Sequence, residues 1–234
     1  MHPFAKDVSG QWGAKPLKDN LTMKKNQDKY LGFYPVIAPL IMGEGVGDGK
    51  TTACVMAQAA TIDALRKGKT LDAPTDEMEC ACPVLRRIAI RLNDTRWWKN
   101  NVERTEHLRP LIPLLLDSKG DETLTDKRVF FAADHAVRDL TPVRLEFIAK
   151  NTKNENVKQD CLDGAKKLRG LSRIKDKASA LKASEVCRKL RAYASADAYA
   201  YASANANAYA YADEQKLRYR AMCVQLFKDL AALK

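Results

Sequence analysis

The sequence predicts an all-α protein, with a compact helical body and a long Ala/Tyr-rich C-terminal helix or helical hairpin. Residues 53–67 are good helix formers that end in cations just before Gly68. Residues 84–92 repeat apolar side chains at helical spacing. Residues 171–234 contain neither Gly nor Pro, so nothing in that stretch forces a break in regular structure.

The chain divides into three regions. Residues 1–30 are polar and are expected to form an extended arm, 31–150 a helical body, and 151–234 a basic and then Ala/Tyr-rich helical region. Within the body we expect helices at 53–67, 84–92 and 126–140. Two helical pieces are expected at 103–116, around Pro110 and Pro113, and another helix after Pro142.

The C-terminal region contains a low-complexity run in which alanine occupies every second position from 192 to 212. Strict alternation is typical of a strand, whereas alanine is the best helix former. Because both flanks are helical in composition, we interpret the run as helix. A continuous helix of about 60 residues would span about 90 Å, so the segment either folds back, at about 203–207, or projects and dimerises. The candidate oligomer contacts are Tyr193, Tyr199, Tyr201, Tyr209 and Tyr211.

Residues 43–52, GEGVGDGKTT, come within one position of a phosphate-binding P-loop. Glu44 stands where the motif requires its first glycine, and it has neither the backbone freedom nor the charge for that position. We still expect Thr51 to open a helix, whose N-terminus would favour an anion. The candidate anion-binding residues are therefore Gly47, Gly49, Lys50 and Thr51. The alternative is a glycine-rich turn that caps an ordinary helix.

A P-loop NTPase also needs a buried strand before the loop and an acidic residue that holds Mg²⁺. Residues 34–42 are apolar like such a strand, but Pro35 and Pro39 remove ladder donors. Asp117 is the candidate acidic residue, in a setting also interrupted by prolines. A divergent P-loop NTPase therefore stays open as an alternative.

The positive charge is concentrated in one region. The chain carries a formal net charge of +11, and residues 150–191 contain thirteen Lys/Arg against five Asp/Glu. Such a region attracts nucleic acid, a nucleotide or an acidic protein surface, although it is also compatible with a solvated helical face. No aromatic residue lies in this stretch to stack on a base, which favours phosphate contact. Its candidate anion-binding residues are Lys166, Lys167, Arg169, Arg188, Lys189 and Arg191.

The cysteine pattern and the length of the apolar runs indicate which features the chain is expected to lack. Six cysteines are scattered without a regular framework and no signal peptide is evident, so we expect reduced thiols in a cytoplasm. No stretch approaches eighteen consecutive apolar residues, so we expect a soluble protein without a membrane span. Cys80 and Cys82 lack the second pair that a zinc site requires, so we expect neither metal nor cofactor.

Two groups of residues resemble acid/base pairs. Asp134 precedes His135, and Glu103 and Glu106 precede His107. Sequence neighbours on a helix point in different directions, so we expect no catalytic residue in either group.

Several blocks together resemble a family of uncharacterised small proteins of bacteriophages and of bacteria that carry prophage-like genes. The blocks are GDGKTTACVM at 47–56, CACPVL at 80–85, LND at 92–94, LRPLIP at 108–113, ADHAVR at 133–138 and the Ala/Tyr/Asp-rich tail. The resemblance covers most of 43–234 and implies an origin and a helical architecture rather than a reaction.

Three functions follow as hypotheses. The first is a non-enzymatic, phage-type binding or inhibitor protein in the host cytoplasm, which engages a nucleotide, nucleic acid or acidic host protein through Lys50 and the basic segment. The second is the divergent P-loop NTPase, with Lys50 and Thr51 on phosphate and Mg²⁺ and Asp117 as the second acid. The third is a structural protein that assembles with its own copies through the Ala/Tyr-rich tail.

Overall fold

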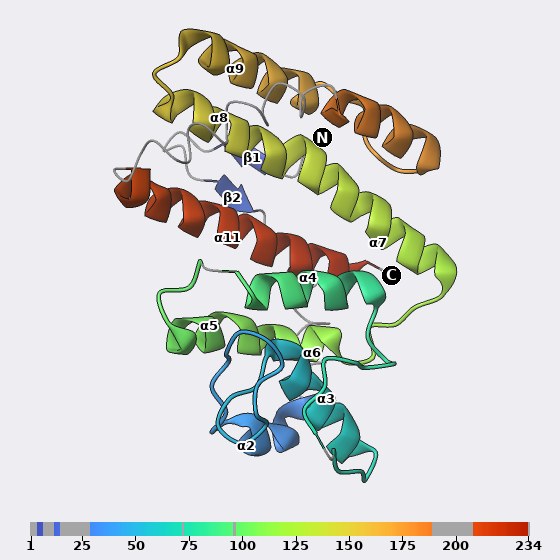
Figure 1. The fold of residues 1–234 in the computed structure, drawn as a ribbon. Coiled ribbons are helices and arrows are strands. Elements are labelled where there is room, and N and C mark those ends of the chain that lie inside the picture. The colour runs from blue at the N-terminus through green and yellow to red at the C-terminus, as the bar shows by residue number, and fades with distance from the viewer. Residues whose placement is uncertain are drawn as a thin grey trace.

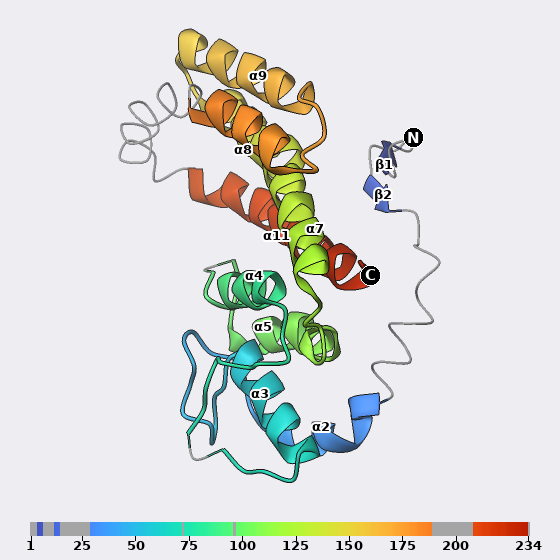
Figure 2. The same ribbon diagram turned by 90° about the vertical axis from the view of Figure 1, so that its right-hand side faces the viewer.

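The computed structural model describes residues 4–6, 12–14, 29–71, 73–95, 97–188 and 208–233, with side chains for 29–71, 73–95, 97–188, 217–218 and 220–233. The fold is all-α, as predicted. In the N-terminal region, β1 (Phe4–Lys6) and β2 (Trp12–Ala14) pair in antiparallel register. Figures 1 and 2 show the helices stacked in layers, with α2 and α3 at one end and α9 at the other.

The first half of the body consists of short helices interrupted at prolines. They are η1 (Leu31–Phe33), α2 (Tyr34–Ile37), α3 (Val55–Arg66), α4 (Pro83–Asn93), α5 (Asn101–Leu108), η2 (Arg109–Leu111) and α6 (Ile112–Leu115). The apolar segment 34–42 is thus helical at its start rather than a strand, with Pro35 in the first turn of α2, where a missing N–H costs nothing. The predicted helices at 84–92 and 103–116 are present with small shifts at their ends.

One long helical path crosses the molecule where two separate helices were predicted. It begins earlier than expected, at α7 (Glu122–His135), and continues through a π-helical segment, η3 (Ala136–Leu140), into α8 (Thr141–Asn151). Pro142 has no N–H to donate to the preceding turn, and the chain passes through the π-helical segment just before it. Within this segment the Ala136 carbonyl accepts from the backbone amide of Thr141 and, at 2.8 Å, from the Thr141 hydroxyl.

The C-terminal region returns to the body. It contains α9 (Glu155–Arg169), a helical segment at 177–188 and α11 (Ala208–Ala232), which packs against α4, α6 and α7. Helix is therefore found at residues 208–212, the end of the alternating run. The rest of the run lies outside the described residues. The docking of α11 argues against a single projecting helix of sixty residues.

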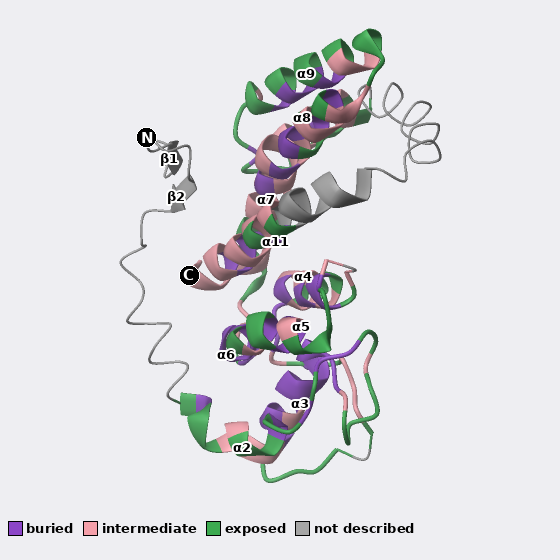
Figure 3. Ribbon diagram, turned by 90° about the vertical axis from the view of Figure 1, so that its left-hand side faces the viewer, coloured by how far each residue is buried: buried purple, intermediate pink, exposed green. Residues whose placement is uncertain are grey.

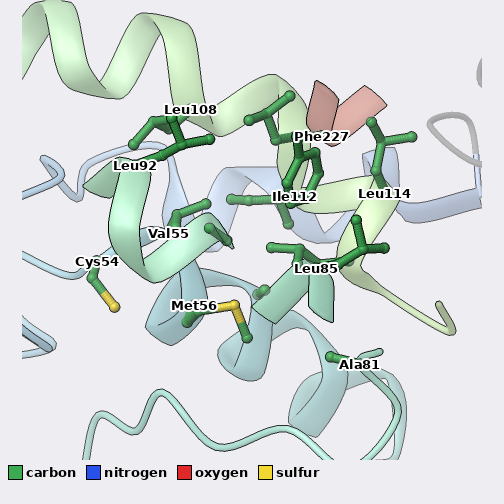
Figure 4. Packing of buried hydrophobic residues seen from close by; sticks show 14 of the residues in the cluster. Cys54, Val55, Met56, Ala81, Leu85, Leu92, Leu108, Ile112, Leu114 and Phe227 are labelled. Atoms are coloured by element: carbon green, nitrogen blue, oxygen red, sulfur yellow. The ribbon is translucent and has the colours of Figure 1, made fainter. Parts of the chain in front are cut away.

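Two clusters of buried side chains hold the described residues together. The larger joins residues between Tyr30 and Leu140 to Leu226, Phe227 and Leu230 of α11, and the smaller joins α8, α9 and the segment 177–188. Figure 4 shows Phe227 pointing into the group that includes Leu85 and Ile112. The division into regions at residues 30 and 150 stays a prediction. Tyr30 and α11 contribute to the larger cluster, and the smaller cluster joins Ala149 and Leu145 to residues after position 150.

We expect the two leucines of α11 to respond very differently to truncation. Leu230 is fully buried, whereas Leu217 is 42% exposed. Leu230→Ala is expected to lower the free energy of unfolding by roughly 2–5 kcal/mol, because it removes buried apolar surface and leaves a cavity. The same change at Leu217 is expected to cost less than about 1 kcal/mol. Urea denaturation measures both, and equal losses would contradict the docking of α11.

Candidate functional site

The glycine-rich loop before α3 is held in place by buried polar side chains of α4 and α5. Asn93, which is fully buried, donates to the Gly43 carbonyl at 2.8 Å and accepts from the Val55 amide at 3.2 Å. The Thr105 hydroxyl accepts from the Met42 amide at 2.8 Å. The loop is therefore anchored at both ends, while its tip, residues 47–51, is exposed.

At the tip of the loop, the anion held by the backbone is the chain's own carboxylate. Asp48 Oδ1 accepts from the amides of Lys50, Thr51 and Thr52 at 2.9, 2.9 and 2.8 Å. These bonds, that from Thr52 above all, hold the pKa of Asp48 well below its usual range. Gly47 and Gly49 have φ values of 87° and 69°, and a Cβ at position 47 would overlap the Thr52 carbonyl.

The predicted P-loop geometry is wrong in two respects. First, α3 begins at Val55 and not at Thr51, with Cys54 as its N-cap, so Lys50 and Thr51 precede the helix instead of opening it. The amides at 50–52 bond to Asp48 instead of continuing a helix. Second, Asp117 binds Arg66 at the far end of α3, which is about 18 Å long at 1.5 Å per residue. The proposed phosphate ligands and the proposed Mg²⁺ acid therefore do not share a site.

Asp117 instead belongs to an ion-pair network. Its carboxylate accepts two bonds from the Arg66 guanidinium, at 2.7 and 2.5 Å, and one from the Tyr30 hydroxyl at 2.7 Å. Lys29 Nζ lies 3.0 Å from the same carboxylate. Arg66, more than any other neighbour, holds the pKa of Asp117 well below its usual range. The network ties the 29–30 segment and the turn after α6 to the end of α3.

The same network contains the one cluster of potential metal ligands among the described residues. The ligand atoms of Asp63, Cys80 and Asp117 lie within 4.8 Å of one another. Asp63, however, already binds Arg66 Nε at 2.7 Å and Lys67 Nζ at 2.6 Å. Burial also raises the pKa of the Cys80 thiol, which opposes thiolate formation. These cations balance the carboxylates, so we interpret the cluster as structural.

The candidate acid/base side chains bind residues four positions away in the helix and not their sequence neighbours. His135 Nδ1 lies 2.8 Å from the Asp139 carboxylate one turn later, and Asp134 binds the guanidinium of Arg138. His107 Nδ1 bonds to the backbone carbonyl of Glu103 at 2.9 Å. Helix geometry explains the change, because residues four apart share a face and adjacent residues do not.

The second candidate site is a basic surface, which we define as the exposed side chains of residues 166–188. Lys166, Lys167 and Arg169 lie on α9, and Arg188 ends the helical segment 177–188; all four are exposed. Figure 3 shows the buried side of α9 facing α8 and its exposed side facing outward. Four cations that sequence reasoning did not single out join them: Arg173, Lys175, Lys177 and Lys182. The excess of Lys/Arg over Asp/Glu in residues 150–191 already indicated that these four cations belong to a basic region.

Hydrogen bonds fix the loop that joins the two helices of the basic surface. The Arg169 guanidinium binds both carboxylate oxygens of Glu146 on α8. The Asp134 carboxylate accepts from the Ile174 amide at 2.8 Å. The Ser179 amide donates to Asp176 at 2.8 Å, which caps the segment 177–188. The cations on this surface are therefore mounted on a rigid support.

The remaining predicted site residues lie outside the described side chains. Lys189, Arg191, Tyr193, Tyr199 and Tyr201 are outside the described residues, and the side chains of Tyr209 and Tyr211 are not described although their backbone is helical. Figures 1 and 2 place the loop before α3 and the helix α9 at opposite ends of the molecule. Lys50 and the basic surface, which sequence reasoning had assigned to one anionic partner, therefore do not form one site.

Comparisons with protein-family models, curated proteins and solved structures find no match. Among the described residues, no helix has both the length and the apolar character to cross a membrane.

The role of Asp48 can be tested by amide hydrogen exchange measured by NMR. Asp48→Ala is expected to speed exchange at Lys50, Thr51 and Thr52, because it removes their common acceptor. Asp48→Asn keeps one side-chain carbonyl in the same place and is expected to retain part of the protection. Unchanged exchange in Asp48→Ala would show that the carboxylate does not organise the loop.

The Asp117 network predicts a change in stability with pH. The folded-state pKa of Asp117 lies below the unfolded value of about 3.9, so its contribution is present above about pH 4 and is lost as the pH falls further. Asp117→Asn is expected to cost about 1 kcal/mol at pH 7, since the side chain is 40% exposed, and progressively less below pH 4. Asparagine also tolerates the φ of 54° at this position.

Urea denaturation at pH 3 to 7 measures this difference. Asp126→Asn on α7 is the control, because that carboxylate is exposed and has no ion-pair partner among the described residues. A difference between wild type and Asp117→Asn that stays constant over the whole range would argue against the ionised pair.

Proposed function

We propose that this chain is a non-enzymatic binding protein whose basic surface holds a nucleic acid through its phosphates. We expect the loop of residues 43–53 to contribute less to anion binding than the sequence predicted, because three of its amides already donate to Asp48. The acidic residue that an NTPase would need is bound to Arg66 instead. Both observations favour binding over nucleotide hydrolysis.

The observation that carries the proposal is a group of exposed cations that form no ion pair with any described carboxylate. Within the described residues, no carboxylate lies at ion-pair distance from six side chains of the basic surface: Lys166, Lys167, Lys175, Lys177, Lys182 and Arg188. Uncompensated cations on one surface create a positive field that attracts polyanions, and phosphate binding releases counter-ions. The support for the proposal is therefore electrostatic.

The chemistry of this surface supports nucleic acid over the other anionic partners. A single nucleotide is held in a concave pocket, whereas these cations extend along the outer sides of two helices. Protein interfaces have apolar cores enriched in aromatic residues. The basic surface offers no aromatic side chain, and its one large exposed apolar residue is Leu181. An acidic protein partner is the outcome that the experiment below distinguishes.

The biological setting belongs to the same proposal. The resemblance of the sequence blocks to phage-type proteins supports a role in a bacterial cytoplasm, where the partner would be host or phage nucleic acid. Six cysteines that form no disulfide fit a reducing compartment. Assembly through the tail tyrosines would be additional to this role and is not needed for it.

Neutralising two cations of the basic surface tests the proposed function. Lys166→Gln/Lys167→Gln is expected to weaken binding to a nucleic acid roughly tenfold or more at 0.1 M salt. It is also expected to reduce the slope of log K against log salt by about 2, because two phosphate contacts are lost. Fluorescence anisotropy with a labelled 20-nucleotide duplex and its single strand, over a series of salt concentrations, measures both quantities.

The matched control neutralises two exposed lysines outside the basic surface, Lys119→Gln/Lys127→Gln. This control removes the same net charge and is expected to leave the slope nearly unchanged. If neither nucleic acid binds, or if both variants lose affinity equally, the proposed function is wrong. Binding of a poly-glutamate peptide in place of nucleic acid would assign the surface to an acidic protein.

A further inference from the structure

We infer that the nucleic acid is double-stranded B-form DNA, with the outer face of the helical segment 177–188 across its major groove. This inference rests on the proposed function and names the partner of the same surface. It depends on three features of the described residues: which cations share a face, what lies between them, and how rigidly the segment is held.

The orientation of the segment 177–188 follows from its burial. Ala183 is 3% exposed, and Val186 and Cys187 pack on the smaller cluster. On the opposite side, Lys177 and Arg188 are both exposed. They are eleven residues apart, which is three helical turns, so they lie on one face and about 16 Å apart along the axis.

This spacing fits the two edges of a B-DNA groove. The major groove is about 12 Å wide and admits an α-helix, and its edges are the two phosphate strands. A cation at each end of the helix face can therefore reach a phosphate on each strand. A-form RNA has a major groove too narrow for a helix, so this geometry selects DNA over RNA duplexes.

The side chains between the two cations suit entry into a groove. The exposed positions on this side are Ala178, Leu181, Ser184 and Glu185. Ala178, Leu181 and Ser184 carry no charge and are not branched at Cβ. The fourth residue, Glu185, already interacts with another group of this chain. None carries the amide or guanidinium fork that reads a base edge, so binding is expected to depend little on sequence.

Single strands are the poorer ligand for the same surface. Proteins that hold single strands stack the bases on aromatic side chains, and residues 150–188 contain none. The loop at 170–176 and the start of the segment are fixed by Glu146, Asp134 and Ser179. A rigid duplex already holds its phosphates at regular spacing, whereas a flexible single strand must lose conformational freedom to match the same cations.

The C-terminal half of α9 extends the contact. Lys166 and Lys167 lie near the loop that leads to the segment, whereas Asp160 and Asp163 lie further toward the start of α9 and repel phosphate. The field therefore strengthens from the start of α9 to its end. This gradient places DNA over the end of α9 and the segment 177–188.

The test compares labelled 20-base-pair DNA with single-stranded DNA and double-stranded RNA of the same sequence, using the full chain at one salt concentration. Duplex DNA is expected to bind at least roughly tenfold more tightly than either, and a second duplex sequence within about threefold of the first. Lys177→Gln/Arg188→Gln is expected to weaken duplex binding by roughly tenfold or more. Lys119→Gln/Lys127→Gln, with thermal unfolding checked for both variants, is expected to bind like wild type.

Failure of this inference is distinguishable from failure of the proposed function. If single strands or RNA duplexes bind as tightly as duplex DNA, the groove geometry is overturned while nucleic-acid binding stands. Wild-type affinity in Lys177→Gln/Arg188→Gln would likewise overturn the placement of the segment. If none of the three nucleic acids binds, both proposals fall together.

Discussion

The fold of this chain depends on one buried guanidinium, that of Arg128 on α7. It donates to the carbonyls of Leu230 and Leu233 at the end of α11, at 3.0 and 3.2 Å, and to the Ser118 carbonyl at 2.5 Å. Burying a cation costs several kcal/mol of folding free energy unless its donors are satisfied. These hydrogen bonds therefore require α7, the end of α11 and the turn at Ser118 to meet at Arg128. Because α7 continues through η3 into α8, Arg128 also attaches to the body the helical path that supports the basic surface.

Charge is compensated very differently at the two ends of the molecule. Around α3, Asp48 binds backbone amides and Asp117 binds Arg66, so the groups that could hold an external ligand already bind one another. Beyond α8, Arg169 is paired with Glu146, but six of the neighbouring cations form no ion pair with a described carboxylate. This asymmetry separates a self-contained structural loop from a surface that attracts anions.

The long helical path through α7, η3 and α8 links these two ends. Its π-helical turn lets Pro142 sit inside the helix without an interruption. Just before this turn, on α7, Asp134 binds both Arg138 and the backbone amide of Ile174 in the loop of the basic surface. Asp134 therefore connects the π-helical segment to the loop that carries the cations. The support of the basic surface is thus continuous with the helical body.

The sequence by itself determined the fold class, most helix positions and the region of uncompensated charge, because helix propensity, proline and net charge are local properties. It could not place the helix start at Val55 or show that Asp48 occupies its own loop, since both depend on side chains that meet the backbone in three dimensions. The partner of Asp117 and the docking of α11 were decided only by tertiary structure. Arg66 and Asp117 are 51 residues apart, and contacts at such separation leave no local pattern in the sequence.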